Sequence, residues 1–313
     1  MKINLTQNKN FKLFKIISKV AQENNQTVYI VGGYVRDLLM QRKAPTDIDF
    51  VTEQSGIELA KAVGKELGDL KVSVFKTYGT AMIKYKDLDL EFVGARKESY
   101  SEDSRKPAVE TGTLEDDQKR RDFTVNALAI SLNAENFGEL IDPFNGREDM
   151  QNKILRTPLE PAQTYSDDPL RMMRAIRFAS VLHFEIEKNS LEAIKQEAER
   201  IKIVSMERIM VEFNKIMLSE KPSVGLKLME ETTLLEKIIP ELTALRGIEE
   251  VEGQTHKDNF WHTLEVVDNI SKNTDNLWLR WAALLHDIGK APTKKFVEKI
   301  GWTFHGHEFL GSK

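Results

Sequence analysis

Residues 28–52 read VYIVGGYVRDLLMQRKAPTDIDFVT. This stretch predicts an apolar strand from Val28 to Val31, a Gly-Gly turn at residues 32–33, a helix, a polar loop and a second strand. The second strand carries Asp47 and Asp49, which project from the same face because side chains alternate along a strand. The two carboxylates can therefore bind one cation together.

This arrangement suits the transfer of a phosphate-bearing group. Divalent ions held by carboxylates neutralise a crowded phosphate and align the attacking and leaving oxygens. Mg²⁺ prefers oxygen ligands, so we expect Mg²⁺ here, with Mn²⁺ as the alternative. The Gly-Gly turn lets backbone N–H groups approach a triphosphate, and Arg36 adds a fixed cation. Each feature alone is common in turns and solvated loops, so the signal lies in the combination.

The combination resembles a family signature. Gly-Gly-x-x-Arg-Asp followed by Asp-x-Asp is similar to the pattern of class II tRNA nucleotidyltransferases and bacterial poly(A) polymerases, within the DNA polymerase beta superfamily. The resemblance implies that Asp47 and Asp49 bind the metal and that Gly33 and Arg36 contact the nucleotide. It also implies an α+β fold, with a small mixed-sheet nucleotidyltransferase head.

Length, composition and charge narrow the class of protein. A chain of 313 residues with 41% hydrophobic content can bury a sizeable core and divide into two or three domains. The net charge of −4 gives no global sign of nucleic-acid binding, so RNA contacts must come from local basic faces. The lack of cysteine excludes disulfides and thiolate metal sites. Without a signal peptide or membrane-length apolar run, we expect a cytoplasmic protein.

The rest of the head is predicted to contain helices at residues 8–25 and 55–67, and strands near residues 71–76, 80–85 and 88–93.

A third carboxylate is predicted on the last of these strands, where Asp89 and Glu91 share a face. The segment EFVGAR, from Glu91, resembles the family's Glu-x-Thr-Thr-x-Arg or Lys segment, with Val93 and Gly94 in place of the threonines. The resemblance implies that Glu91 completes the catalytic trio. The alternative is an exposed strand carboxylate.

A charged stretch, residues 97–118, lacks an apolar period and is predicted to be a mobile loop over the site. From residue 118, QKRRDFTVNALAISL predicts a helix with Asp122 and Asn126 one turn apart and Arg121 beside them. Such a face can bind a ribose hydroxyl and a phosphate. RRDFTVNAL is nearly identical to the family's second motif, which implies that Asp122 and Arg121 select ribonucleotides.

Residues 165–184, YSDDPLRMMRAIRFASVLHF, predict a helix on which Arg171, Arg174 and Arg177 recur on one side. Three cations together suggest anionic partners, RNA or a triphosphate, although a solvated face is the alternative. Asp168 can accept from an exocyclic amine while Arg171 donates to a ring atom, a combination that suits cytosine and adenine. The segment resembles the family's Glu-Asp-x-x-Arg motif, with an aspartate replacing the glutamate.

A later helix, which begins at Ser205, is expected to have a structural role and not a catalytic one. Its sequence resembles the family's fifth motif, Glu-Arg-x-x-x-Glu. We expect Ser205 to cap it and Glu207, Arg208 and Glu212 to hold the neck and body together. Residues 141–158 resemble the third motif and are assigned hinge and packing roles.

The C-terminal stretch carries a second group of metal-ligand residues. His262, His286, Asp287, His305 and His307 lie on or beside predicted helices, and imidazoles with a carboxylate can hold transition-metal ions that activate water. LLHDIGK resembles the HD-domain phosphohydrolases, which implies a metal site at the first three. The distal aspartate of that family is not visible, so we expect a truncated domain or an incomplete site that acts as a scaffold.

Together these motifs predict a nucleotidyltransferase head at residues 1–150, an all-helical neck and body at 151–245 that binds base and RNA, and an HD-like domain at 246–313. The predicted activity is addition of CCA to the 3′ end of tRNA from CTP and ATP, with release of pyrophosphate. A poly(A) polymerase or an enzyme restricted to CC or A addition shares these residues. A metal-dependent HD phosphohydrolase and a non-catalytic RNA-binding module remain the alternatives from other classes.

Overall fold

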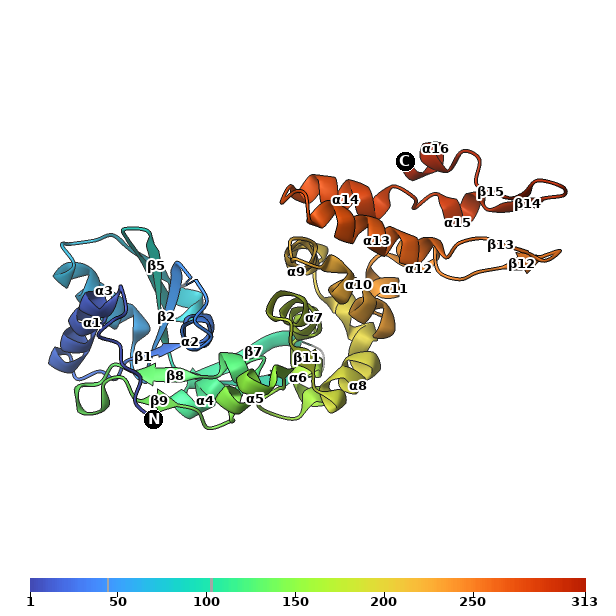
Figure 1. Cartoon of the computed structure of the whole chain (residues 1–313). Helices are drawn as coiled ribbons and strands as arrows, with labels where there is room; N and C mark the ends of the chain where they lie inside the picture. The colour runs from blue at the N-terminus through green and yellow to red at the C-terminus, as the bar shows by residue number, and fades with distance from the viewer. Residues whose placement is uncertain (44, 102–103) are drawn as a thin grey trace. The chain divides into compact units, whose positions relative to one another are not determined.

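The structure, a computed structural model, describes residues 1–43, 45–101 and 104–313. The chain divides into two compact units, Met1–Glu160 and Pro161–Lys313 (Figure 1). The first is an α+β unit and the second is mainly helical, which confirms the predicted fold class. The three-part division predicted from the sequence stays a prediction.

A seven-stranded mixed sheet forms the centre of the first unit, in the order β3-β4-β5-β2-β1-β8-β9. Strands β2 and β5 run parallel, and the other neighbouring strands run antiparallel. The strands are β1 (Tyr29–Val31), β2 (Asp47–Thr52), β3 (Val72–Phe75), β4 (Thr80–Tyr85), β5 (Leu88–Gly94), β8 (Ala129–Ser131) and β9 (Leu140–Ile141).

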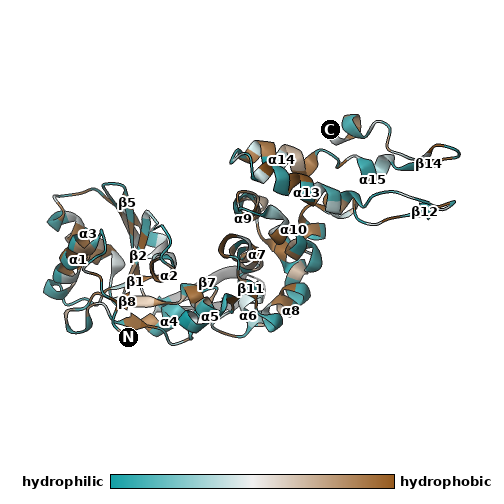
Figure 2. Cartoon of the chain, in the orientation of Figure 1, coloured by the Kyte–Doolittle hydropathy of each residue, from teal (hydrophilic) through white to brown (hydrophobic). Residues whose placement is uncertain are grey.

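Two predicted helices, α1 (Phe11–Glu23) and α3 (Gly56–Glu66), are confirmed and belong to the main core of this unit. In Figure 2 both helices carry apolar and polar stretches, as expected where one side meets a core and the other meets solvent. The Phe50 ring packs 6.4 Å from that of Phe14 on α1 and 5.0 Å from that of Phe92. Because Ile48 and Phe50 point into this core, Asp47 and Asp49, which alternate with them along β2, point to the other face.

The helix after the Gly-Gly turn is confirmed as α2 (Gly33–Leu39). The predicted loop at residues 97–118 is wrong, since the backbone forms an antiparallel hairpin of β6 (Arg96–Ser101) and β7 (Ser104–Thr111). Residues 102–103 of that stretch lie outside the described residues. Backbone pairing sustains the hairpin without the apolar alternation on which the prediction relied.

The helix predicted to begin at residue 118 is also wrong, because residue 118 lies in the last turn of a helix that ends at Lys119. Thr113 forms a capping box with Asp116 that fixes the start of α4 (Leu114–Lys119). The 3₁₀ turn η2 (Thr124–Asn126) and strand β8 follow. Pairing with β1 takes the apolar residues of β8 into the sheet, which overrides their helical spacing. The α5 helix (Gly146–Asn152) and the short β10 (Ile154–Leu155) complete the unit, with 3₁₀ turns η1 (Lys76–Tyr78) and η3 (Ala134–Asn136).

The second unit is helical apart from β11 (Glu185–Ile186) and two short hairpins, β12 (Glu250–Val251) with β13 (Gln254–Thr255) and β14 (Lys295–Val297) with β15 (Gly301–Thr303). None of the helices that the structure describes combines the length and apolar character needed to cross a membrane. The helices are α6 (Pro161–Asp167), α7 (Leu170–Leu182), α8 (Lys188–Glu197), η4 (Ala198–Ile203), α9 (Met206–Met217), α10 (Pro222–Glu231), α11 (Leu234–Ile238), α12 (Pro240–Thr243), α13 (Asn259–Ser271), α14 (Leu277–Leu285), α15 (Lys290–Thr293) and α16 (His307–Gly311).

A buried arginine ties three helices of this unit together. Arg280 on α14 is 1% exposed. Its guanidinium donates to the carbonyls of Met217 at 2.7 Å and Ser219 at 2.8 Å, at the end of α9. It also donates to the carbonyls of Ser271 at 3.1 Å and Thr274 at 2.9 Å, at the end of α13. One cation thus satisfies carbonyls that helix ends leave without donors.

Candidate active site

Strands β2 and β5 bring the predicted carboxylates together on one face of the sheet. In their parallel register Asp47 lies opposite Asp89, and Asp49 lies opposite Glu91. Asp89 is neutralised by Lys84, whose Nζ lies 2.9 Å from its carboxylate. Within the described parts of the chain, Asp47, Asp49 and Glu91 make no hydrogen bond or ion pair through their carboxylates. Three acceptor groups are therefore available to a cation.

Burial raises the pKa of Asp49; Arg121 opposes this shift, and the neighbouring Asp47 carboxylate adds to it. Burial also raises the pKa of Glu91, and the charge of Asp49 adds to that shift. Both directions mean that the site holds more negative charge than its surroundings stabilise. A divalent ion would remove this penalty, so these carboxylates suit a metal ion by their electrostatics as well as by their geometry.

The Gly-Gly turn needs glycine at its first position. Gly32 has a φ of +73°, and a Cβ there would lie 2.8 Å from Nη1 of Arg121 and 3.6 Å from Oδ2 of Asp49. At Gly33 the nearest atom to an added Cβ is Nη2 of Arg36, at 3.6 Å, which is ordinary contact. Packing therefore explains Gly32 but leaves Gly33 free to serve a ligand.

Three residues of the predicted nucleotide site form a buried chain of hydrogen bonds. Arg36 donates from Nη1 to Oδ1 of Asn126 at 2.7 Å, and Asn126 donates to Oδ1 of Asp122 at 2.9 Å. Arg36 is also held by Asp37 through Nε and Nη2. The structure thus brings Arg36, Asn126 and Asp122 together, although all three are at most 8% exposed. They form a rigid wall beside the turn.

One residue that the sequence reasoning missed is Asp117 on α4, whose side chain is fully buried. Arg121 donates to its Oδ2 from Nε at 3.1 Å and from Nη2 at 2.9 Å, and Arg120 bonds its other oxygen. Burial on its own raises the pKa of Asp117, but the Arg121 and Arg120 guanidiniums outweigh it and hold the pKa below its usual value. The signal in the sequence was an aspartate three and four residues before two arginines, the spacing of a helical ion pair.

In the second unit, Asp168 and Arg171 lie at the start of α7. Asp168 accepts from the backbone N–H of Leu170 at 3.3 Å, whereas Asp167 accepts from Gln163 within α6. Asp168 is thus the acidic residue at the start of α7. Arg171 lies one turn further along and is half-buried. The pair predicted to read a base is therefore held on one helix end.

Farther along α7, Arg177 has a structural partner. Its Nε bonds a carboxylate oxygen of Glu212 on α9, and both side chains are largely buried. The guanidiniums of Arg177 and Arg174 lie 3.7 and 5.6 Å from the centre of the Phe178 ring. The expected structural role of Glu212 is confirmed, and its ion pair with Arg177 helps to hold α7 against α9.

The other expectations for α9 are wrong. The Ser205 side chain makes no capping hydrogen bond. Glu207 and Arg208 are exposed, and their side chains make no hydrogen bond or ion pair with the residues that the structure describes. They lie on the exposed side of the first turn of α9.

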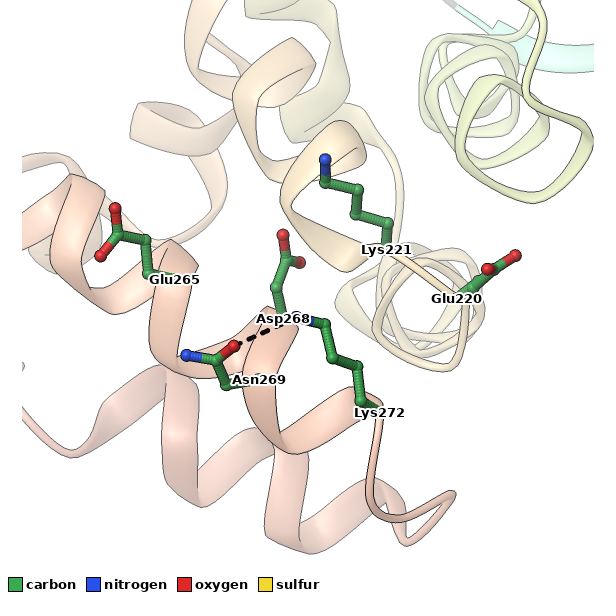
Figure 3. A pocket seen from close by; sticks show the side chains of 6 residues that line it. All are labelled: Glu220, Lys221, Glu265, Asp268, Asn269 and Lys272. Carbon is green, nitrogen blue, oxygen red and sulfur yellow. Dashed lines mark hydrogen bonds between the residues drawn. The ribbon is translucent and has the colours of Figure 1, made fainter.

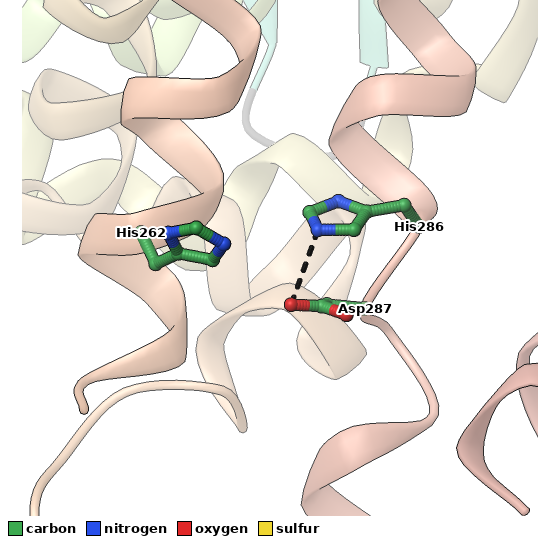
Figure 4. A group of neighbouring side chains, drawn as sticks. All are labelled: His262, His286 and Asp287. Atoms are coloured by element: carbon green, nitrogen blue, oxygen red, sulfur yellow. Dashed lines mark ion pairs between the residues drawn. The ribbon is translucent and has the colours of Figure 1, made fainter. Parts of the chain in front are cut away.

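The predicted second metal group comes together in Figure 4. Each of His262 on α13, His286 at the end of α14, and Asp287 offers one ligand atom, and these atoms lie within 4.8 Å of one another. Nε2 of His286 lies 3.1 Å from Oδ2 of Asp287. Nδ1 of His286 lies 2.8 Å from a carbonyl of α14, which fixes the ring. These three residues can hold a metal ion.

Of the two downstream histidines, only His307 joins this group. Its Nε2 lies 3.7 Å from Oδ1 of Asp287, whereas His305 is exposed. Lys290 donates to the other oxygen of Asp287 at 2.7 Å. The Asp287 carboxylate is therefore surrounded by three cationic or potentially cationic groups.

A hollow of 470 Å³ on the second unit contains none of the predicted residues (Figure 3). Within it, Asp268 accepts from the backbone N–H of Ser223 at 3.0 Å and from its hydroxyl at 2.6 Å, which caps α10. Acidic and basic side chains are mixed around it. Its lining consists of Glu220, Lys221, Glu265, Asp268, Asn269 and Lys272.

Comparisons with known proteins agree with this geometry. Residues 28–156 match the family described as the poly A polymerase head domain, residues 183–245 the probable RNA and SrmB-binding site of polymerase A, and residues 259–313 the HD domain. A CCA-adding enzyme of Bacillus velezensis is 35% identical over 297 residues, which cover 94% of this chain and 68% of that protein. The chain belongs to the tRNA nucleotidyltransferase and poly(A) polymerase family.

Other members of the tRNA nucleotidyltransferase and poly(A) polymerase family extend the comparison. An A-adding tRNA nucleotidyltransferase of Aquifex aeolicus is 34% identical over 91% of this chain and 34% of its own length. A solved tRNA-processing enzyme in its apo form has a TM-score of 0.74 at 30% identity and covers all of this chain and 81% of its own. A tRNA nucleotidyltransferase complexed with a primer tRNA and an ATP analog has a TM-score of 0.68 at 29% identity, over 94% of this chain and 79% of its own. The chain thus spans between about a third and two thirds of the length of the first curated relatives it matches.

Proposed function

We propose that this member of the tRNA nucleotidyltransferase family adds CCA to the 3′ end of tRNA from CTP and ATP. The observation that carries the proposal is a set of three carboxylates, Asp47, Asp49 and Glu91, which have no partner among the described residues. One parallel strand pair holds them beside a glycine turn. In the reaction the terminal hydroxyl of the RNA attacks the α-phosphate, a new ester bond forms, and the bond to pyrophosphate breaks.

The three carboxylates would hold Mg²⁺, which supplies charge neutralisation and alignment of the reacting oxygens when bound. Gly33 would offer its backbone to the triphosphate. Arg121, which already faces Asp49, would hold a phosphate of the nucleotide. The buried wall formed by Arg36, Asn126 and Asp122 gives the ribose a fixed surface. We also propose a cytoplasmic location, where tRNA is matured.

Base choice would fall to the start of α7. Asp168 can accept from the exocyclic amine of cytosine or adenine while Arg171 donates to the adjoining ring atom. Guanine and uracil lack that amine at the same edge. Arg174 would contact RNA or triphosphate, and Arg177, tied to Glu212, would support α7 and contribute charge.

Sequencing the RNA ends after incubation with tRNA lacking its last three nucleotides tests the activity. With CTP and ATP together we expect CCA ends, and with CTP alone CC ends. A-only ends would identify an A-adding enzyme, and long A tails would identify a poly(A) polymerase. Asp49→Asn should abolish addition, whereas Asp89→Asn, on the same face but neutralised by Lys84, should retain most of it. Equal losses in both variants would contradict the carboxylate assignment.

The histidine group favours a second candidate activity, metal-dependent phosphate ester hydrolysis. His262, His286 and Asp287 supply the ligand set for a transition metal that activates water. We expect hydrolysis of bis-p-nitrophenyl phosphate with added Ni²⁺ or Mn²⁺, lost in His286→Ala and retained in Asp47→Ala. Hydrolysis that disappears in Asp47→Ala but survives in His286→Ala would refute this assignment.

A further inference from the structure

The Arg121 guanidinium lies between two carboxylates but bonds only one of them. It donates from Nε and Nη2 to Asp117 and from Nη1 to the carbonyl of Asn126 at 3.3 Å. Asp49 is near, since its Oδ2 and Nη1 of Arg121 both lie within 3.6 Å of the point where a Gly32 Cβ would stand. Among the described residues, however, no hydrogen bond or ion pair joins Arg121 to Asp49.

The competition between these carboxylates is uneven. Asp117 is fully buried, and its Oδ2 accepts two N–H groups of Arg121, which fixes the guanidinium plane. Asp49 is only partly buried and faces Arg121 across the Gly32 turn. Without Asp117 as its partner, the Arg121 guanidinium would turn to the nearby Asp49 carboxylate and form an ion pair with it, because both groups are charged and weakly solvated.

We propose that Asp117 is a positioning residue that anchors Arg121 and so keeps the Asp49 carboxylate available to a divalent cation. Asp117 itself touches neither metal nor nucleotide. Its buried carboxylate holds the Arg121 guanidinium near enough to Asp49 to bind a phosphate of the nucleotide there. The guanidinium stays too far away to form an ion pair with the Asp49 carboxylate, which is the metal ligand. This inference rests on the proposed function, because it takes Asp49 to be a metal ligand.

The position of Asp117 on α4 supports a fixed anchor. The capping box of Thr113 and Asp116 sets the start of the helix. Gln118, next in the chain and buried, donates to the carbonyl of Ala127 at 2.6 Å, which ties α4 to the segment before β8. Hydrogen bonds on both sides of Asp117 therefore hold the backbone that carries its carboxylate.

Mn²⁺ binding to the full chain tests the proposal without relying on turnover. Free Mn²⁺ is followed by its electron paramagnetic resonance signal, and the site lost in Asp49→Asn is taken as the head site. For Asp117→Asn we expect the Kd of that site for Mn²⁺ to rise roughly tenfold. An adjacent arginine lowers the affinity of a carboxylate for a proton by about tenfold or more, and we take the lower end of that effect for Mn²⁺. In the double variant Asp117→Asn/Arg121→Gln the Kd should return to within about threefold of the wild-type value, since the competitor is gone.

Matched variants separate anchoring from general damage. Asp116→Asn weakens the start of the same helix but leaves Arg121 anchored, so its Kd for Mn²⁺ should stay at the wild-type value. If Asp117→Asn does not fold, Arg121→Lys and Arg121→Gln give the same comparison with Asp117 in place. Lysine keeps the charge but cannot form the two-pronged bond, so Lys should weaken Mn²⁺ binding and Gln should not.

The outcomes distinguish this inference from the function on which it rests. If the wild type binds Mn²⁺ at no site that depends on Asp49, the proposed function and this inference both fail. If the wild type binds Mn²⁺ there but Asp117→Asn binds equally well, or the double variant binds as weakly as the single one, only the anchoring role is overturned.

Discussion

The two adjacent glycines offer the sharpest test of the site, because the structure predicts opposite responses to the same substitution. In Gly32→Ala the new Cβ would meet Nη1 of Arg121 at 2.8 Å, with the backbone at a φ of +73° and a ψ of −138°. A side chain in such a sparsely populated conformation costs about 1–3 kcal/mol. Displacing Arg121 weakens hydrogen bonds that contribute roughly 1 kcal/mol or more each. We therefore expect Gly32→Ala to lower the free energy of unfolding by about 2–4 kcal/mol.

Gly33→Ala is the matched control. Gly33 is the first residue of α2 and has no contact closer than 3.6 Å for an added Cβ. Alanine in a helix is favoured over glycine by up to about 1 kcal/mol, so the free energy of unfolding should stay equal or rise slightly. Addition of CMP should nonetheless slow, with a higher KM for CTP, if the Gly33 backbone contacts the triphosphate.

Urea unfolding followed by circular dichroism measures both stabilities, and single-nucleotide addition at varied CTP measures the KM. Equal destabilisation by the two substitutions would refute the packing argument for Gly32. Unchanged addition kinetics in Gly33→Ala would refute the nucleotide contact while leaving the packing argument intact.

Three further predictions concern charge and packing. Burial, opposed by Arg121 and assisted by Asp47, raises the pKa of Asp49 from its ordinary value of 3.8, so its ionised form costs the folded state free energy above that pH. Without divalent ions, Asp49→Asn should thus be more stable than the wild type at pH 7.5, and this gain should shrink on acidification and vanish below pH 3.8, where the carboxyl is protonated in both the folded and the unfolded state. Urea unfolding in EDTA across this range tests it, and a gain that grows on acidification would contradict the sign. Arg280→Met should lower the free energy of unfolding of the second unit by about 2–5 kcal/mol, because each buried carbonyl left without a donor costs roughly 1–3 kcal/mol. Lys272→Met, at an exposed position, is the control. If the urea midpoint falls no further in Arg280→Met than in this control, the carbonyls find other partners. Arg177→Met should leave Glu212 buried without its guanidinium and cost about 3 kcal/mol, measured by the same method; an unchanged midpoint would mean that Lys215, 3.3 Å from Glu212, compensates.

The sequence predicts the centre of the head well because two strong patterns coincide there. Alternation along β2 places Asp47 and Asp49 opposite the buried Ile48 and Phe50, and the Gly-Gly turn marks the start of α2. Both are local signals, so no tertiary information was needed. The same reasoning applies to Glu91, which follows the alternation of β5.

The failures lie where tertiary contacts decide the structure. The hairpin β6–β7 has no apolar alternation to reveal it, and the helical spacing after residue 118 gives way to the pairing of β8 with β1. A local signal for α4 did exist, the Thr113-x-x-Asp116 capping pattern, but the charged surroundings obscured it. That Arg177 pairs with Glu212 depends on the packing of α7 on α9, which the spacing of arginines along α7 cannot reveal.

The parallel ladder between β2 and β5 makes the position of the three carboxylates depend on correct folding. Each acid of the trio stands one residue away from a large apolar side chain of the same strand, Phe50 or Phe92 among them. Sliding either strand by a single position would drive its carboxylates into the aromatic interior and expel the phenylalanines into solvent. A molecule with a shifted strand would therefore be much less stable, so the register that buries the phenylalanines also fixes the three carboxylates on the opposite face of the sheet.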